Sequence, residues 1–257
     1  MDDKLELRSY GDPSLPVLVY LPGLHGDWTL ISGFRSAVAG RVHFVEMAYP
    51  RTVTWSLDDY ASTIEEELSK LGITRGWLLG ESFGSQPMWK LIAREKFQAQ
   101  GAVLAGGFVK HPFQWFMSPL EKLLRGVPSF VLVKMMFGYA RYARMRYRRS
   151  PQTLATLDEF LARRRGHMDR ESAQYRLQML GQNDLRQTAM TTRVPIFGLT
   201  GILDPIVPWH PVRRWLKQNC PALRDYKIIP RADHNVLNTG MQESAQWILQ
   251  WIQSAKT

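Results

Sequence analysis

A serine placed between two glycines is the feature of this sequence with the most chemical content. The pentapeptide Gly80-Glu81-Ser82-Phe83-Gly84 directly follows a short apolar run and opens a helical pattern. Such a segment can hold its serine on a sharp, strained turn, where a base reaches the hydroxyl. Glycine at both flanking positions avoids Cβ atoms that would collide at so tight a reversal. We therefore predict that Ser82 is a nucleophile, although ordinary strand-to-helix turns also contain this spacing.

A serine hydroxyl is a weak nucleophile until a base removes its proton. Of the six histidines, His234 is the best candidate for that base, because it follows the last predicted strand across a short loop. This placement puts it at the same edge of the sheet as Ser82. His43 and His210 favour structural or surface roles. His111 and His167 lie where they could contact a substrate, but solvated positions are the more common outcome.

The base in turn needs an acid that fixes its tautomer and stabilises its charge. Asp204 is predicted to be this acid, because it follows the strand predicted at 195–200, in a loop that Pro205 stiffens. The alternative is an ordinary turn aspartate. Asp233 adjoins His234, but side chains of neighbouring residues in an extended loop cannot easily hydrogen-bond to each other.

Short β-rich segments alternate with helical patterns along the chain. Strands are predicted at 4–8, 17–21, 42–46, 76–80, 102–105, 195–200 and 225–229. Helices are predicted at 29–39, 57–71, 82–97, 210–218 and 241–254. This alternation predicts an α/β domain with a mainly parallel, doubly wound sheet covered by helices on both faces. Ligand sites of such sheets lie at the carboxyl ends of the strands.

One connection between strands is much longer than the others. About 90 residues separate the strands predicted at 102–105 and 195–200, whereas a simple crossover needs only about a dozen. Helical patterns fill this connection at 113–124, 131–149, 151–164 and 172–184. We therefore predict that residues 108–190, called the insertion below, form a helical cap on a core domain made of residues 1–107 and 191–257.

The chain order Ser82, Asp204, His234 resembles that of the α/β-hydrolase superfamily, and the resemblance covers nearly the whole chain. It implies a serine hydrolase fold with a helical cap. Relatives that open epoxides or displace halides carry aspartate at the position of Ser82. The serine therefore implies acyl transfer through an ester intermediate.

The segment Leu21-Pro22-Gly23-Leu24-His25-Gly26-Asp27 is similar to the oxyanion loop of the same superfamily. The resemblance implies that the backbone N–H groups of Leu24 and Phe83 stabilise the oxyanion, a contribution of about 3 kcal/mol each. The dipeptide His25-Gly26 offers a second register, one or two residues further along.

Composition narrows the class of protein. The chain has 257 residues, of which 45% are hydrophobic and 22% charged, as in folded soluble proteins. No segment approaches the roughly 20 apolar residues that span a bilayer, and the acidic start lacks a secretion signal, so a cytoplasmic location is expected. Cys220 is the single cysteine, which excludes an internal disulfide and a cysteine-based metal cluster. We predict neither a cofactor nor a metal site.

Nearly all of the net charge of +10 lies in the insertion, which contains 15 of the 33 basic residues and 6 of the 23 acidic ones. The densest part is residues 139–149. One interpretation is a solvated helix face. A second is attraction to anions, either a membrane surface or a phosphorylated acyl carrier. Nucleic acid is the least favoured partner, because no recognition fold accompanies the charge.

These observations predict a serine hydrolase of esterase, lipase or thioesterase type that acts on a small acyl ester or thioester. Two alternatives stay open. The same fold and serine also support carbon–carbon bond hydrolysis, lyase or perhydrolase chemistry. The basic insertion is also compatible with a non-catalytic protein that binds anions or a membrane surface.

Overall fold

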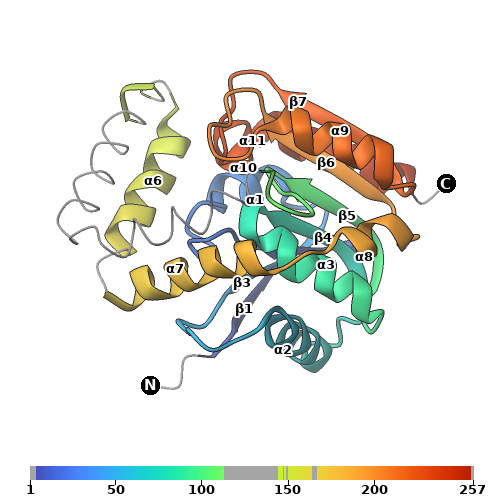
Figure 1. Cartoon of the computed structure of the whole chain (residues 1–257). Helices are drawn as coiled ribbons and strands as arrows, with labels where there is room; N and C mark the ends of the chain where they lie inside the picture. The colour runs from blue at the N-terminus through green and yellow to red at the C-terminus, as the bar shows by residue number, and fades with distance from the viewer. Residues whose placement is uncertain (1–3, 113–143, 147, 149, 164–166, 256–257) are drawn as a thin grey trace.

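The computed structural model describes residues 4–112, 144–146, 148, 150–163 and 167–255. Its centre is a seven-stranded sheet with the order β1-β3-β2-β4-β5-β6-β7, in which only β1 runs antiparallel, to β3 (Figure 1). The strands are β1 (Glu6–Tyr10), β2 (Val17–Leu21), β3 (His43–Ala48), β4 (Arg75–Glu81), β5 (Gln98–Ala105), β6 (Ile196–Gly201) and β7 (Leu223–Ile229). The predicted, mainly parallel sheet is confirmed.

Helices cover both faces of this sheet (Figure 1). One face is covered by α1 (Ser32–Val38), α10 (Val236–Thr239) and α11 (Met241–Ser254). The other is covered by α2 (Leu57–Lys70), α3 (Ser85–Arg94), α8 (Arg186–Thr191) and α9 (Trp209–Asn219). Alternate strand residues enter the two cores: Leu18 and Tyr20 pack on the first face, Val19 and Leu21 on the second. Burial on both faces explains why a central strand such as β2 is a continuous apolar run, whereas the edge strand β1 is largely exposed and mostly polar.

The helix predicted at 82–97 differs from the one observed. The chain forms a 3₁₀ turn, η1 (Ser82–Gly84), before α3, and α3 ends at Arg94. It ends there because Glu95 adopts a left-handed conformation with φ of 56°. Phe97 is buried as predicted, but it packs from the connection before β5 and not from the helix. The short helices α8 and α10 were not predicted, because single turns carry little periodicity.

The described part of the insertion contains α6 (Pro151–Arg163), α7 (His167–Gln182) and all but the last residue of α8. In Figure 1, α6 stands beside the carboxyl edge of the sheet, and α7 returns toward α3. The helix predicted at 113–124 and most of that at 131–149 lie outside the described residues. The division into core and cap stays a prediction. Within the described ranges, no helix combines the length and apolar character needed to cross a membrane.

Candidate active site

The turn that follows β4 places Ser82 under backbone strain. Ser82 has φ of 50°, a left-handed conformation that is uncommon for a residue with a side chain. The two glycines allow the turn to form. A Cβ at Gly84 would lie 2.1 Å from the carbonyl oxygen of Leu21, and one at Gly80 would lie 2.9 Å from Cα of Ser85. The sequence-based explanation of these glycines is thus confirmed.

Replacing Gly84 by alanine is expected to destabilise the fold by more than about 4 kcal/mol, because the new methyl group would collide with rigid backbone. Gly72→Ala is the matched control: its φ is 72°, but no atom lies within 4 Å of the added Cβ. That change is expected to cost only about 1–2 kcal/mol for the left-handed backbone. Urea denaturation compares the two variants. Equal midpoints for Gly84→Ala and the wild type would contradict the prediction.

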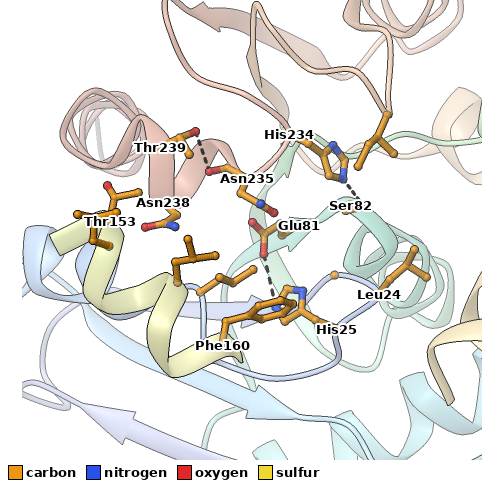
Figure 2. Close-up of a pocket in the computed structure, with 15 residues that line it drawn as sticks. Leu24, His25, Glu81, Ser82, Thr153, Phe160, His234, Asn235, Asn238 and Thr239 are labelled. Carbon is orange, nitrogen blue, oxygen red and sulfur yellow. Dashed lines mark hydrogen bonds and ion pairs between the residues drawn. The ribbon is translucent and has the colours of Figure 1, made fainter. Parts of the chain in front are cut away.

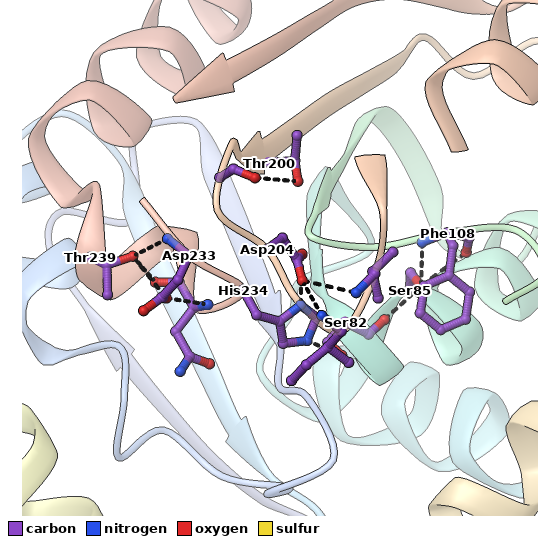
Figure 3. Close-up of polar contacts among 12 residues, drawn as sticks. Ser82, Ser85, Phe108, Thr200, Asp204, Asp233, His234 and Thr239 are labelled. Atoms are coloured by element: carbon purple, nitrogen blue, oxygen red, sulfur yellow. Dashed lines mark hydrogen bonds and ion pairs between the residues drawn. The ribbon is translucent and has the colours of Figure 1, made fainter. Parts of the chain in front are cut away.

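Three side chains from different parts of the sequence meet beside this turn (Figure 3). His234 Nε2 lies 2.8 Å from Ser82 Oγ, and His234 Nδ1 lies 2.8 Å from Asp204 Oδ2. The other carboxylate oxygen of Asp204 accepts hydrogen bonds from the backbone N–H groups of Ile206 and Val207, at 2.9 and 2.8 Å. With a proton on Nδ1 donated to Asp204, Nε2 is free to accept from the serine hydroxyl. The arrangement can activate Ser82.

Asp233, the neighbour of His234 in sequence, has a different role. Its Oδ1 accepts from the backbone N–H of Asn235 at 3.0 Å and from Thr239 Oγ1 at 3.1 Å (Figure 3). These bonds hold the loop that leads into α10. The structure therefore pairs His234 with Asp204, as the sequence predicts.

The chain is similar to known proteins in structure but not in sequence. No protein-family model matches the chain, and no curated protein matches it in sequence. Solved structures do match. An esterase from Thermogutta terrifontis has 17% identity and a TM-score of 0.76 over 98% of this chain and 94% of its own. A hydrolase from Pseudomonas aeruginosa has 14% identity and a TM-score of 0.79, over 96% and 94%. An enol-lactonase from Burkholderia xenovorans has 18% identity and a TM-score of 0.75, over 97% and 96%.

The chain has the α/β-hydrolase fold. In this α/β-hydrolase fold, Ser82 follows β4, Asp204 follows β6 and His234 follows β7, all at the carboxyl ends of parallel strands. That edge is where sheets of this kind bind ligands.

The pKa of His234 is set by opposing effects. Burial lowers it, but the hydrogen bond to Asp204 and the charge of Asp204, with smaller contributions from Glu81 and Asp233, raise it above the ordinary value of 6.5. Only the neutral imidazole can accept the proton of Ser82. A raised pKa therefore means that, as the pH falls, His234 becomes protonated and inactive as a base at a higher pH than an ordinary histidine.

We expect kcat/KM for an ester to fall about tenfold per pH unit below a pKa that lies above 6.5. A pH-stat assay between pH 5 and 9 with an uncharged ester measures this limb. Asp204→Asn removes the main group that raises the pKa of His234. The acid limb of its residual activity should therefore lie at lower pH than the limb of the wild type. A wild-type limb below pH 6.5 would contradict this prediction.

The predicted oxyanion loop lies against the nucleophile. A Cβ at Gly23 would lie 3.4 Å from Cβ of Ser82, and the turn is closed by a hydrogen bond of 2.9 Å from Gly26 N to the Gly23 carbonyl. Leu24 lines the cavity beside Ser82. Phe83 is fully buried, and its ring packs against Tyr60. The donor roles of Leu24 and Phe83 stay predictions.

Arg176 of α7, which the sequence analysis did not single out, holds this loop. It is 2% exposed, and Nη1 donates to the Leu24 carbonyl at 2.9 Å, Nη2 to the Pro50 carbonyl at 3.1 Å and Nε to Tyr60 Oη at 3.4 Å. Its guanidinium also lies 5.5 Å from the centre of the Tyr49 ring. One side chain thus connects the insertion to the predicted oxyanion loop.

Arg176→Lys is expected to lower stability by about 1–3 kcal/mol, because a single ammonium cannot serve all of these buried acceptors. A small displacement of the Leu24 peptide should lower kcat by about 10²-fold with little change in KM. Arg186→Lys is the control, since Arg186 pairs with Asp184 at the surface and its replacement should change stability by less than about 0.5 kcal/mol. Equal kcat values for Arg176→Lys and wild type would refute the coupling.

A cavity of about 180 Å³ opens beside Ser82 (Figure 2). Apolar side chains form much of its wall: Leu24, Leu30, Leu154, Leu157, Phe160 and Ile206. Glu81, His25, Asn235 and Asn238 add polar groups. Sequence reasoning missed most of these residues. One sequence feature could have identified Glu81, because a carboxylate at the end of a buried strand is unusual. No feature of the sequence identifies Asn238 or the α6 residues as part of the cavity.

Of the other histidines, His25 lines the cavity, whereas His111 and the cysteine, Cys220, do not. His111 is buried against the Phe108 ring at 5.0 Å and does not line the cavity. His25 packs edge-on against Phe160, and its Nε2 lies 4.0 Å from Glu81 Oε2. Cys220 is buried, and burial raises the pKa of its thiol. Among the described residues, no cluster of three histidine, cysteine or acidic side chains is placed to hold a metal ion.

Proposed function

We propose that this chain is a serine hydrolase that cleaves small carboxylic esters through an acyl-enzyme intermediate. The observation that carries the proposal is the pair of 2.8 Å contacts joining Ser82, His234 and Asp204 beside a cavity. Structurally similar proteins include an esterase and an enol-lactonase, which supports hydrolysis of an ester bond.

The proposed reaction uses each of these groups in turn. Ser82 Oγ attacks the acyl carbon while its proton passes to His234 Nε2, and Asp204 stabilises the imidazolium. The backbone N–H groups of Leu24 and Phe83 stabilise the oxyanion. The tetrahedral intermediate expels the alcohol, which takes the proton from His234. Water then attacks the acyl-enzyme, again with His234 as base, and releases the acid and Ser82.

The size of the cavity favours a short acyl group. A cavity of about 150 Å³ holds a molecule the size of benzene, so 180 Å³ accommodates about six heavy atoms. The apolar side chains from α6, Leu154, Leu157 and Phe160, suit a hydrocarbon chain of that length. Among the subclasses of esterase, lipase and thioesterase, this geometry supports an esterase for acyl groups of about four to six carbons.

A fluorophosphonate probe tests the proposal. We expect the wild type to gain one adduct, located on Ser82 by peptide mass spectrometry, and Ser82→Ala to gain none. A panel of 4-nitrophenyl esters and thioesters of rising acyl length then reports the cavity, with the highest kcat/KM at about four to six carbons. A folded wild type that neither reacts with the probe nor hydrolyses any ester would refute the proposal. An optimum at long chains would refute the short-acyl assignment.

The basic segment at 139–149 supplies no second function of comparable support. Most of it lies outside the described residues. Of its described arginines, Arg144 forms an ion pair with Asp158 of α6, and Arg146 Nη2 donates to the Arg231 carbonyl at 3.3 Å. These contacts favour a structural role for the two side chains over attraction of a carrier or a membrane.

A further inference from the structure

The cavity beside Ser82 contains two buried polar groups that the proposed reaction does not use. Asn238 of α10 is 5% exposed, and its Oδ1 has no hydrogen-bond partner among the described residues. Glu81 is 2% exposed, and the Tyr20 hydroxyl donates a hydrogen bond to its Oε2. Both side chains line the cavity, and in Figure 2 Glu81 lies between Asn238 and the Ser82–His234 pair.

Unpaired buried acceptors are rare in folded proteins because each one loses its hydrogen bonds to water without replacement. Asn238 Oδ1 is such an atom, and the carboxyl group of Glu81 lines the same small cavity. A group on a bound molecule that donates a hydrogen bond would compensate this loss. A purely apolar substrate would leave Asn238 Oδ1 unpaired and would cover the Glu81 carboxyl group without giving it a hydrogen bond.

We propose that Asn238 and Glu81 form a subsite for a hydroxyl group on the ester substrate. The inference rests on the proposed esterase function and specifies its substrate class. A hydroxyl donates to one of the two oxygens and can accept from the Asn238 amide. A carboxylate or phosphate would bring further acceptors against Glu81. The apolar wall formed by Leu154 and Leu157 disfavours a fully charged group, since removing a charge from water costs far more than removing a hydroxyl.

The ionisation of Glu81 is compatible with this role. Burial raises its pKa to about 7, although the hydrogen bond from Tyr20 and the nearby His234 act in the opposite direction. In either state the carboxyl group can pair with a hydroxyl, as acceptor when ionised and as donor when protonated. The preference for a hydroxyl should therefore persist across neutral pH.

Matched substrates in which a methyl group replaces the hydroxyl test the subsite. On the acyl side, ethyl 3-hydroxybutyrate is compared with ethyl 3-methylbutyrate. On the alcohol side, 2-hydroxyethyl butyrate is compared with propyl butyrate. A site that hydrogen-bonds a hydroxyl discriminates strongly against the analogue that lacks it. We expect kcat/KM to favour the hydroxyl partner by at least about tenfold in one arm, which also identifies the side of the scissile bond.

Variants at Asn238 assign the preference to the subsite. Asn238→Leu and Asn238→Ala should reduce the hydroxyl-to-methyl ratio by about tenfold. Asn238→Leu should also keep or raise the melting temperature, because it removes an unpaired buried acceptor, whereas a structural asparagine would lower it. Asn219→Leu is the control: its amide donates to the Trp215 carbonyl on α9, away from the cavity, so the ratio should stay at the wild-type value.

The results of these assays distinguish failure of the hydroxyl subsite from failure of the proposed esterase function. Hydrolysis of these esters with ratios near or below one in both arms would overturn the subsite and leave the esterase assignment intact. A wild-type preference that Asn238→Leu and Asn238→Ala both preserve would also overturn it. Absence of both Ser82 labelling and hydrolysis would overturn the subsite together with the proposed function.

Discussion

Ser82→Ala is expected to lower kcat for a short-chain ester by about 10⁶-fold, because no other described side chain of the site is positioned to attack the acyl carbon. The remaining rate, about 10³–10⁴-fold above that in water, would come from the oxyanion donors and binding alone. Initial rates with 4-nitrophenyl butyrate, measured at enzyme concentrations high enough to detect the residual activity, test this expectation.

Folding must be shown to be unaffected in the same experiment. Ser82 adopts a left-handed backbone conformation that alanine can also occupy at modest cost, so thermal unfolding should change little. Ser36→Ala serves as a control. Its hydroxyl donates to the Ser32 carbonyl on an exposed part of α1, and its loss should leave kcat within about twofold. Turnover by Ser82→Ala at the wild-type rate would eliminate the acyl-enzyme mechanism.

Asp204→Asn is expected to lower kcat by about 10⁴-fold without disturbing the fold. The asparagine amide would donate where the carboxylate accepts, so His234 would carry its proton on Nε2 and could no longer accept from Ser82. The imidazolium formed in the reaction would also lose its counter-charge. Steady-state kinetics on the high-pH plateau of the wild-type profile isolates this effect from the acid limb.

Asp233→Asn is the matched control for this assignment, since it changes a second carboxylate beside the same histidine. Asparagine Oδ1 can still accept from Asn235 N and Thr239 Oγ1, so kcat should stay within about tenfold of the wild-type value. A larger loss for Asp233→Asn than for Asp204→Asn would reverse the identity of the acid.

The sequence alone determined the elements of this site whose signals are local. Glycine is needed around Ser82 because Cβ atoms would block the backbone reversal. In the structure, a Cβ added at Gly80 or Gly84 would collide with neighbouring backbone. All seven predicted strands are present in the sheet, and strands buried on both faces, such as β2 and β6, are continuous apolar runs because burial leaves no room for polar alternation. Parallel strands end at one edge, so Asp204 and His234 could be placed near Ser82 from their order alone.

Helix ends and the contents of the cavity depended on tertiary structure. The turn at Ser82 and the left-handed Glu95 shortened the predicted helix at both ends, an outcome of local backbone geometry that periodicity does not encode. Nothing local distinguishes Arg176 from the other arginines of the insertion. Its burial arises because α7 packs against the turn at Ser82 and meets the carbonyls of Leu24 and Pro50.

The same reason explains why Asn238 and Glu81 could not be paired from the sequence. They lie more than 150 residues apart, on α10 and at the end of β4, and only the folded chain places both at one cavity. A sequence pattern shows which residues can react and which strand ends they follow. The packing of helices from distant segments decides which polar groups are left without partners beside them, and therefore which substrates the site can select.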